Sequence, residues 1–248
     1  MIKLEHVVLA SPEQMGFIIE GMRNPMNSWE KSDSDRCSSI HACDIHFDHC
    51  DKCIHSNKRI GGDFAIGEND HSLMQRLANA GTDHRKFMRM MPVYVRITAP
   101  LYWWKEFSTY KVGTVANSCS TMHKIAEKEF ALEDFSHDNL INMMEEPIPY
   151  SENAVYAINA VEMLEETIDV LNCLRSNYLN TKDKKYWWQM IQLLPSSYNQ
   201  TRNVMMNYEV LSNIYKSRRN HKLDEWCELC AWVKTLPYQE LITGETYD

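Results

Sequence analysis

Hydrophobic and polar positions alternate early in the chain and recur at helical spacing later. Strands are predicted where apolar and polar side chains alternate, at residues 3–9, 63–67 and 93–98. Amphipathic helices are predicted where apolar residues recur at threes and fours, at residues 13–22, 72–80, 153–178, 182–194 and 201–236. The last of these helices is expected to bend near Arg219 and Asn220. Strands early and long helices late indicate an α+β fold.

Local signals place some of the helix ends. Ser11 is a typical N-cap, and Pro12 suits the first position of the helix that follows. Asn69 or Asp70 is expected to cap the helix at 72–80, and Pro195 should stop the helix at 182–194. Cys227 and Cys230 lie three residues apart inside the last helix, and this spacing favours a packed face over a metal knuckle.

Residues 97–125 combine aromatic, charged, small and hydroxyl side chains more densely than the rest of the chain. A short amphipathic helix is predicted at 100–107, entered through Pro100. Small and turn-forming residues follow it, namely Gly113, Asn117, Ser118, Cys119, Ser120 and Thr121. Such a segment suits a loop that binds a ligand through hydroxyls and backbone amides. The alternative is a buried Trp-rich helix, a solvated loop and a helix N-cap at Ser120 or Thr121.

Composition narrows the class of protein. The 248 residues are 44% hydrophobic with eight glycines and eight prolines, so we predict one globular domain over residues 1–248. The net charge of −8 disfavours a duplex nucleic-acid binder, because such proteins need a basic surface. The apolar runs are too short for a membrane span and the N-terminus is unlike a signal peptide, so we expect a cytoplasmic protein.

Cysteine and histidine cluster in residues 36–56, which we predict to be an insertion within the domain. Cys37, Cys43, Cys50 and Cys53 are interleaved there with histidines. The Cys-x2-Cys at 50–53 is typical of half a structural zinc site, whereas the other two spacings are longer than common zinc knuckles use. Three interpretations stay open: structural zinc on these four cysteines, an iron–sulfur cluster, or reduced thiols. Metal analysis and an absorption spectrum separate them.

Several short motifs follow one another between Trp104 and Ser120. Trp104-Lys105-Glu106-Phe107 is an aromatic-basic-Glu-aromatic run, Gly113-Thr114 is a small pair, and Asn117-Ser118-Cys119-Ser120 ends the series. Their order resembles the signature of the flavin-dependent thymidylate synthases, the ThyX-like family. In that family an equivalent run precedes Arg-His-Arg-x7-Ser, which contains a Gly-Ser pair and an Asn-Glu-x-Ser. This chain has one extra residue near Val115-Ala116.

The resemblance extends over most of residues 66–236 and to the first strand and helix. The family's His-x-Ser-x-x-Glu-His falls on His84-Arg85-Lys86-Phe87-Met88-Arg89-Met90, where only the first His is kept. A Leu-Pro, an Asn-x-Arg and a further Arg of the family fall on Leu194-Pro195, Asn207-Tyr208-Glu209 and Arg218. The resemblance therefore implies a ThyX-like α+β fold, in which a small antiparallel sheet packs with long helices.

Three places where the family has arginine lack it in this chain. Arg-His-Arg is replaced by Thr109, Tyr110 and Lys111. The family's Ser-x-Arg becomes Ser120-Thr121-Met122, and the Arg of its last motif falls on Cys227 or Glu228. Met or Thr cannot replace a bidentate arginine on a phosphate. The expected replacement cations are Lys105, Lys111, His123, Lys124, Arg85, Lys86 and Arg89, each of which is otherwise a solvated basic side chain.

The resemblance implies a function and a set of site residues. The implied reaction is methylation of a pyrimidine deoxynucleotide with a folate and reduced FAD, with NADPH as co-substrate, in a homotetramer. The candidate cofactor-binding residues are His84, Lys105, Thr109, Tyr110, Lys111, Asn117 and Asn207. The candidate substrate-binding residues are Ser118, Ser120, His123 and Arg218. Ser120 and Cys119 are the candidate catalytic residues. Two interpretations of Cys119 stay open: a thiol nucleophile activated by Lys105, Lys111 or His123, or an inert loop cysteine.

Two function classes stay open after these departures. The first, which we favour, is an enzyme of the ThyX-like kind with a changed substrate or changed anchoring residues. The second is a non-catalytic module that binds a nucleotide or a protein on the same fold, because the missing arginines weaken the case for a standard synthase. A purely structural role comes third, since small polar groups between large aromatics suit a ligand pocket better than a core.

Overall fold

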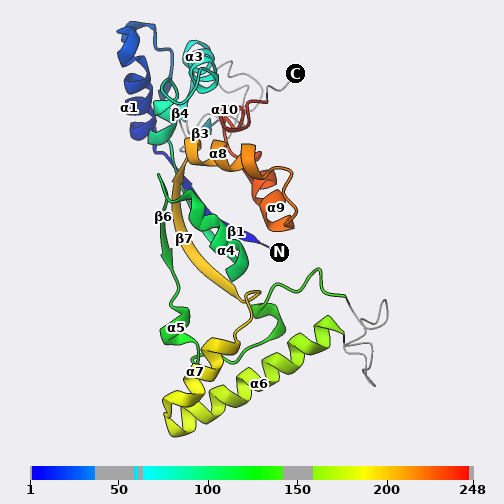
Figure 1. Ribbon diagram of the computed structural model, residues 1–248. Coiled ribbons are helices and arrows are strands. Elements are labelled where there is room, and N and C mark those ends of the chain that lie inside the picture. The colour runs from blue at the N-terminus through cyan, green and yellow to red at the C-terminus, as the bar shows by residue number, and fades with distance from the viewer. Residues whose placement is uncertain (1, 37–58, 61–63, 142–158, 246–248) are drawn as a thin grey trace, which may run out of the picture. The chain divides into compact units, whose positions relative to one another are not determined.

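The computed structural model describes residues 2–36, 59–60, 64–141 and 159–245, which divide into two compact units (Figure 1). Unit 1 comprises Met1–Lys3, Thr98–Thr109 and Ser118–Arg202. Unit 2 comprises Leu4–Ile97, Tyr110–Asn117 and Asn203–Asp248. Within the described residues, no helix is long and apolar enough to cross a membrane.

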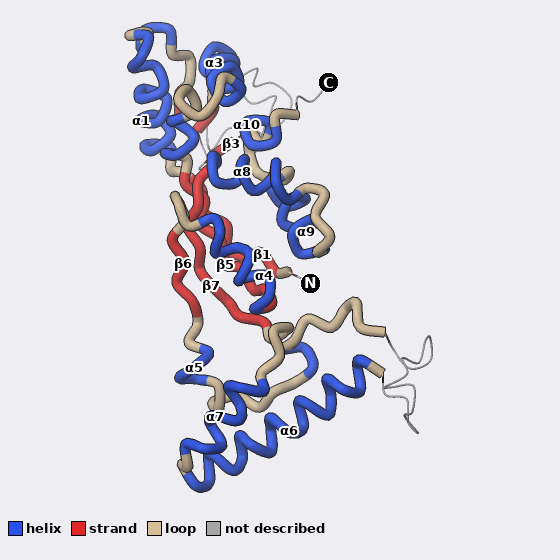
Figure 2. Tube along the Cα trace, in the orientation of Figure 1, coloured by secondary structure: helices blue, strands red, loops and turns tan. Residues whose placement is uncertain are grey.

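A four-stranded sheet has the order β1-β5-β7-β6. Its strands are β1 (Lys3–Leu9), β5 (Pro92–Pro100), β6 (Val115–Ser118) and β7 (Asn199–Asn207), drawn as red strands in Figure 2. Strands β5 and β7 each supply residues to both units. The inner positions of β5 alternate with outer ones, because Val93, Val95 and Ile97 are buried while Tyr94 and Arg96 are exposed. The predicted α+β fold is confirmed.

Unit 2 holds most of the helices that precede or follow the sheet strands. They are α1 (Pro12–Arg23), α3 (Glu68–Asn79), η4 (Lys86–Met90), α8 (Tyr208–Arg218), α9 (Asp224–Val233) and α10 (Glu240–Thr243). Helix α1 begins as predicted, because the Ser11 side chain accepts from the Gln14 N–H and the Gln14 side chain accepts from the Ser11 N–H. Two short 3₁₀ turns follow it, η1 (Asn24–Met26) and η2 (Trp29–Lys31).

A second, three-stranded sheet in unit 2 is made of very short strands. They are β2 (Asp35–Arg36), β4 (Phe64–Ala65) and β3 (Arg59–Ile60), in that spatial order. Strand β4 lies in the middle and pairs antiparallel with both neighbours, so that Phe64 is opposite Arg36 on one side and Ile60 on the other. The four predicted metal ligands Cys37, Cys43, Cys50 and Cys53 lie outside the described residues.

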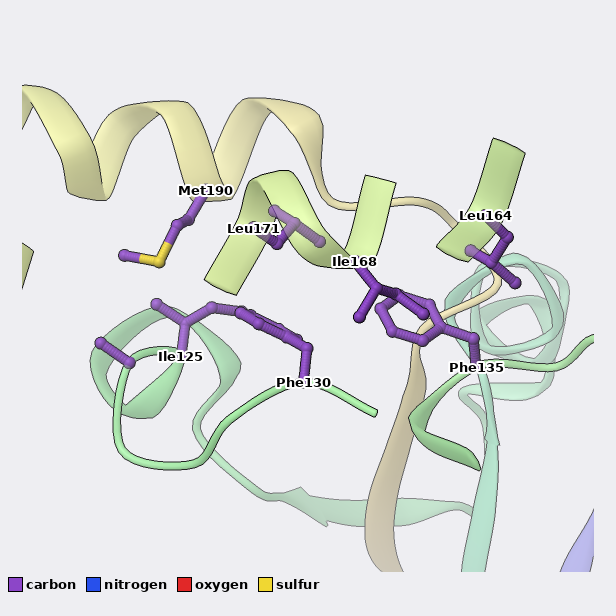
Figure 3. Close-up of a cluster of buried hydrophobic side chains, with 8 residues drawn as sticks. Ile125, Phe130, Phe135, Leu164, Ile168, Leu171 and Met190 are labelled. Carbon is purple, nitrogen blue, oxygen red and sulfur yellow. The ribbon is translucent and has the colours of Figure 1, made fainter. Parts of the chain in front are cut away.

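Unit 1 is built on a helical hairpin and an aromatic helix. Its elements are α4 (Leu101–Phe107), α5 (Thr121–Lys124), η6 (Leu132–Asp134), α6 (Ala160–Thr181) and α7 (Lys184–Leu193), with η5 (Ser108–Tyr110) at its edge. Helices α6 and α7 lie side by side in Figure 1. Figure 3 shows the core beneath them, in which Leu164, Ile168 and Leu171 of α6 face Met190 of α7 and the phenyl rings of Phe130 and Phe135. Burial of these apolar side chains stabilises the unit.

Helix α4 contributes three buried aromatic side chains to unit 1. Trp103, Trp104 and Phe107 are buried, and their rings lie 4.9–5.3 Å apart in stacked and edge-to-face geometry. The N–H groups of Leu101 and Tyr102 donate to the carbonyl oxygens of Tyr198 and Ser196, at 3.0 Å each. The predicted Trp-rich helix is therefore present and ties the end of β5 to the start of β7.

The buried carboxylate of Asp70 connects α3 to α1 and to residues 32–34 in unit 2. Asp70 is fully buried in α3, where one oxygen accepts from the Arg23 guanidinium at 2.6 Å. The other oxygen accepts from the Ser32 and Ser34 hydroxyls and from the N–H groups of Asp33 and Ser34, at 2.6–3.1 Å. Burial by itself raises the pKa of Asp70, but the bonds from Ser34, Ser32 and Arg23 outweigh it and hold the pKa below its usual value.

Two sequence-based predictions of secondary structure are wrong, and so is one predicted helix cap. Residues 201–236 are not one helix, because Asn199–Asn207 is the strand β7 and two separate helices follow it. Residues 115–118 form the strand β6 rather than a loop. Asp70 does not cap α3: the helix begins at Glu68 after Gly67, and the side chain of Asp33 accepts from the N–H groups of Asn69 and Asp70.

Candidate functional site

Cys119 and Ser120 form the turn that joins β6 to α5 in unit 1. The Ser120 hydroxyl oxygen accepts from the His123 N–H at 3.3 Å, so Ser120 is the N-cap of α5. The Cys119 N–H donates to the carbonyl oxygen of Thr201 at 3.0 Å, which fixes the turn against β7. The side chains of Cys119, Ser120 and His123 are exposed.

Gln200 and Arg202, both on β7, hold this turn through a chain of hydrogen bonds. The Gln200 amide nitrogen donates to the Cys119 carbonyl oxygen at 3.1 Å and to the Thr121 hydroxyl at 2.8 Å. The Gln200 amide oxygen accepts from Arg202 Nε at 2.9 Å. The Arg202 guanidinium lies 4.2 Å from the ring centre of Trp104, whose indole N–H donates to the Gln200 carbonyl oxygen. A continuous polar network therefore orients the Cys119 turn on the aromatic helix α4.

A pocket of about 400 Å³ opens next to the turn, entirely within unit 1. Its walls come from β1, the end of β5, the Cys119 turn, α5, η6 and the start of β7, and include Lys3, Thr98, Cys119, Ser120, Lys124, Tyr198, Asn199 and Thr201. Hydroxyl, amide and ammonium groups share these walls with the carboxylates of Glu133 and Asp134. The Thr98 and Thr201 hydroxyls are 2.7 Å apart. The Asn199 side-chain oxygen is buried and has no hydrogen-bond partner among the described residues.

Carboxylates moderate the positive charge around this pocket. Asp134 accepts from the Lys128 ammonium at 2.7 Å, and this bond raises the pKa of Lys128. Glu127 pairs with Lys124 on α5. Burial first, and then the charge of Asp134, raise the pKa of Tyr198, so its hydroxyl is neutral at physiological pH and can donate a hydrogen bond. The pocket therefore offers a neutral phenol, hydroxyls and an amide more than strong cations.

Other predicted site residues divide between the two units. Lys105 of α4 and Thr109 of η5 lie in unit 1, and the Thr109 hydroxyl donates to the Glu106 carbonyl oxygen at 2.9 Å. Ser118 lies at the end of β6, exposed, in unit 1. The predicted residues in unit 2 are His84, Tyr110, Lys111, Asn117, Asn207 and Arg218.

Tyr110 and Arg218 come together in unit 2. Arg218, in the last turn of α8, donates through Nε to the Tyr110 hydroxyl at 3.0 Å. The same guanidinium lies 4.8 Å from the ring centre of Trp226, a fully buried residue of α9. A guanidinium stacked on an aromatic face and bonded to a phenol is held in one orientation. The sequence predicted different roles for these two residues, cofactor binding for Tyr110 and substrate binding for Arg218, so their contact was not anticipated.

Asn207 fixes the turn that carries Lys111. Its side-chain oxygen accepts from the Val210 N–H at 3.0 Å, which caps α8, and its amide nitrogen donates to the Gly113 carbonyl oxygen at 3.5 Å. Gly113 has φ +78°, and a Cβ there would lie 3.0 Å from Asn207 Nδ2 and from Val210 Cγ2. The turn therefore needs glycine. Lys111 itself is exposed, as are His84 and Asn117.

An ion cluster joins η4 to α8 in unit 2. Arg85 Nε donates to one oxygen of Glu209 at 3.1 Å, and Arg89 Nε donates to the other. Arg85 also donates to the side-chain oxygen of Asn213 at 3.1 Å. Burial raises the pKa of Glu209, but the hydrogen bonds and charges of Arg89 and Arg85 outweigh it, so the pKa is lower than usual. Two of the expected replacement cations are thus already bound to a carboxylate.

Acid should destabilise unit 2 through Asp70 and Glu209. Each carboxyl has a folded-state pKa below its unfolded value, so its contribution is complete above the unfolded value of about 4 and is lost as the pH falls through the folded value. We expect the melting temperature to fall steeply below about pH 4. The measurement is thermal unfolding by circular dichroism from pH 7 to pH 3. Glu209→Gln should lower stability at pH 7 and flatten the acid dependence; an unchanged slope would contradict this assignment.

The fold has counterparts among solved structures. It is similar over 98% of each chain to the flavin-dependent thymidylate synthase ThyX of Helicobacter pylori, complexed with FAD and dUMP, at 17% identity and a TM-score of 0.58. A second structure of that enzyme with FAD and dUMP gives a TM-score of 0.59. The UMP/dUMP methylase PolB of Streptomyces cacaoi, bound with 5-Br dUMP, is similar over 98% of this chain and 94% of its own, at 14% identity and a TM-score of 0.53.

These similarities define the fold as ThyX-like. No protein-family model matches the chain, and no curated protein matches it in sequence. The order of motifs between Trp104 and Ser120 had predicted this fold, and that prediction is confirmed by structures that cover nearly the whole chain.

Proposed function

We propose that this protein binds a pyrimidine nucleotide in the unit 1 pocket and methylates it with the help of FAD. The observation that carries the proposal is the Cys119 turn, which Gln200 and Thr201 fix beside a pocket lined by hydroxyl and amide side chains. The ThyX-like fold adds support, since the similar structures hold dUMP or its 5-bromo analogue.

The pocket groups suit a nucleotide in particular ways. The Tyr198, Thr98 and Thr201 hydroxyls would bond its ribose or ring oxygens. Lys3 and Lys124 would attract its phosphate. The Cys119 thiol would lie beside the bound nucleotide, and Ser120 would keep the turn in place as the cap of α5.

The residues present also offer groups that fit FAD. Tyr110 and Arg218 form a preorganised phenol–guanidinium pair. Lys111 belongs to the adjoining turn, to which Asn207 donates a hydrogen bond. We assign these four residues to flavin binding, where Arg218 would take the place of an arginine that the Arg-His-Arg motif lacks. Reduced FAD would supply the hydride of the methylation reaction, with a folate as one-carbon donor and NADPH as reductant. We also propose that the protein is a homotetramer and that it is cytoplasmic.

Flavin absorbance and calorimetry test this function. The purified protein is expected to absorb near the flavin bands, or to take up added FAD, and to bind dUMP or UMP. Gln200→Ala should weaken nucleotide binding by roughly tenfold, because it removes the two bonds that fix the Cys119 turn. Gln192→Ala, an exposed glutamine on α7, is the matched control. A protein that takes up neither FAD nor a pyrimidine nucleotide would overturn the proposal.

A binding module without turnover is the second candidate. The replacement of the family's Arg-His-Arg by Thr109, Tyr110 and Lys111 favours it, because one arginine is lost there and the other becomes a lysine, which cannot bind a phosphate in the bidentate way. Nucleotide and FAD binding with no methylated product, in the presence of methylenetetrahydrofolate and NADPH, would select this candidate over the enzyme.

A further inference from the structure

The turn between α6 and α7 gathers lysine and aromatic side chains. Helix α6 ends at Thr181 and α7 begins at Lys184, so residues 178–188 form the tip of the helical hairpin of unit 1 (Figure 1). This hairpin tip contains one acidic residue, Asp183, beside three lysines and four aromatic residues, namely Lys182, Lys184, Lys185, Tyr178, Tyr186, Trp187 and Trp188. A chain with a net charge of −8 therefore has a local excess of positive charge here.

Asp183 neutralises only one of the three lysines. One of its oxygens accepts from the Lys185 N–H at 3.0 Å, and the other lies 3.1 Å from Lys185 Nζ. Among the described residues, Lys182 and Lys184 form no ion pair with a carboxylate. The Lys184 ammonium lies 5.6 Å from the ring centre of Trp188, and that of Lys182 lies 5.9 Å from the ring centre of Tyr178. A cation–π contact orients an ammonium without neutralising it, so the field outside the hairpin tip is positive.

The local backbone does not favour lysine at these positions. Lys182 ends α6 with φ +56°, a left-handed conformation in which glycine is the preferred residue. Lys184 and Lys185 are the first two residues of α7, where the helix dipole favours carboxylates and disfavours cations. All three lysines thus make the hairpin less stable than the residues preferred there would. Departures from local preference without a compensating contact are typical of functional positions.

Apolar side chains are exposed beside these lysines. The side chain of Trp188 is 45% exposed and that of Leu179 is 38% exposed. The Trp188 ring packs edge-on against Trp187, whose indole N–H donates to the Met122 carbonyl oxygen, so the exposed indole is held in place. Indole and aliphatic groups next to ammoniums suit the boundary between lipid headgroups and acyl chains. Leucine offers no ring on which a base could stack, so this composition favours a lipid surface over single-stranded nucleic acid.

We propose that the hairpin tip is a docking surface for an anionic lipid bilayer. Lys182 and Lys184 would contact the anionic headgroups, while Trp188 and Leu179 would enter the headgroup region. Binding would be peripheral and reversible, and it would weaken with salt because ions screen the lysine charges. The hairpin tip shares no residue with the lining of the unit 1 pocket, so this surface is separate from the proposed nucleotide site.

Co-sedimentation of the purified protein with vesicles tests this surface. The protein is expected to bind vesicles of phosphatidylcholine with phosphatidylserine at low salt, and not vesicles of phosphatidylcholine alone. Each basic residue near such a surface contributes roughly fivefold in affinity, so Lys184→Glu should weaken binding at least about tenfold. Lys222→Glu changes an exposed lysine between α8 and α9 and is the matched control. Trp188→Ala should also weaken binding, whereas Phe17→Ala, which removes a 66% exposed ring from α1, should not.

Thermal unfolding separates this role from a purely structural one. Lys182→Gly is expected to raise the melting temperature by about 2–4 °C, because glycine relieves the left-handed strain. The same variant should bind the anionic vesicles about fivefold more weakly. A lysine kept for the stability of the hairpin would instead give a lower melting temperature, and that result would contradict the explanation of why Lys182 is there.

The remaining outcomes decide the partner. Equal binding by Lys184→Glu and Lys222→Glu, equal binding to both kinds of vesicle, or no vesicle binding by the unaltered protein would overturn the docking surface. Binding of a fluorescent single-stranded oligonucleotide through Lys184, without vesicle binding, would overturn the lipid surface and assign the hairpin tip to nucleic acid. Binding of dUMP should be the same in Lys184→Glu as in the unaltered protein, which shows that the variant is folded.

Discussion

Asp70→Asn is expected to lower the melting temperature by about 10 °C, the largest effect of any substitution considered. An amide in place of the carboxylate would point a donor at the N–H groups of Asp33 and Ser34, which donate to the same Asp70 oxygen. It would also leave the Arg23 guanidinium buried without its counter-ion. Breaking a buried ion pair from one side costs about 3–5 kcal/mol, which corresponds to this shift in a chain of this size.

Calorimetry of the purified variants measures this effect. Glu68→Gln is the matched control, because Glu68 is exposed in the first turn of the same helix, and its change should stay within about 0.5 kcal/mol. If Asp70→Asn melted together with Glu68→Gln, the Asp70 network would not be what holds residues 32–34 to α3.

Gly67→Ala is expected to cost about 2–3 kcal/mol of stability. A Cβ at Gly67 would lie 2.2 Å from the carboxyl carbon of Asp33 and 2.5 Å from its carbonyl oxygen, so the backbone itself would have to move. The Asp33 carboxylate accepts from the N–H groups of Asn69 and Asp70, and its displacement would remove the cap of α3.

Urea unfolding followed by circular dichroism measures this loss. Gly16→Ala is a stringent control, since among the described residues a Cβ there would meet only Phe64, at 4.0 Å. Because Gly16 lies inside α1, that change should stabilise the protein by about 0.5–1 kcal/mol. The two Gly-to-Ala changes should therefore have opposite signs, and equal signs would contradict the explanation.

Elements with strong local signals could be predicted from the sequence. Ser11 and Pro12 begin α1 because a hydroxyl cap and a proline at the first position act within one turn of the chain. The alternation from Val93 to Thr98 predicted β5, whose inner residues are buried. These elements depend on interactions between residues close in sequence, and the order of apolar, polar and capping residues reveals such interactions.

Strands β6 and β7 could not be recognised from periodicity. Val204 in β7 falls at helical spacing from Tyr208 and Leu211 of α8, so a strand that runs directly into a helix imitated one helix. The signals that could have separated them are the alternation of the buried Val204 and Met206 and the capping residue Asn207. All four side chains of β6 are exposed, so that strand has no apolar alternation to detect.

The part of the candidate site that lies within one short stretch of sequence could be predicted, whereas its partners from distant strands and helices could not. The density of small polar residues predicted a functional loop at Cys119 and Ser120, and that loop borders the unit 1 pocket. Its partners Gln200 and Arg202 were missed, because the strand β7 that carries them was not recognised: Arg202 lies in the segment predicted to be helical, and Gln200 lies directly before it. The pairing of Glu209 with Arg85 and Arg89 joins residues more than a hundred positions apart, which periodicity does not record.

The short strand β4 has a consequence for how this fold tolerates change in length. Because Arg36 and Ile60 pair with Phe64 from opposite sides, the chain leaves and re-enters the small sheet at points only about 10 Å apart. Closing a loop between two fixed ends costs entropy that grows only with the logarithm of its length, about 0.6 kcal/mol for each doubling. A change in the number of residues between Arg36 and Arg59 should therefore cost the small sheet little stability.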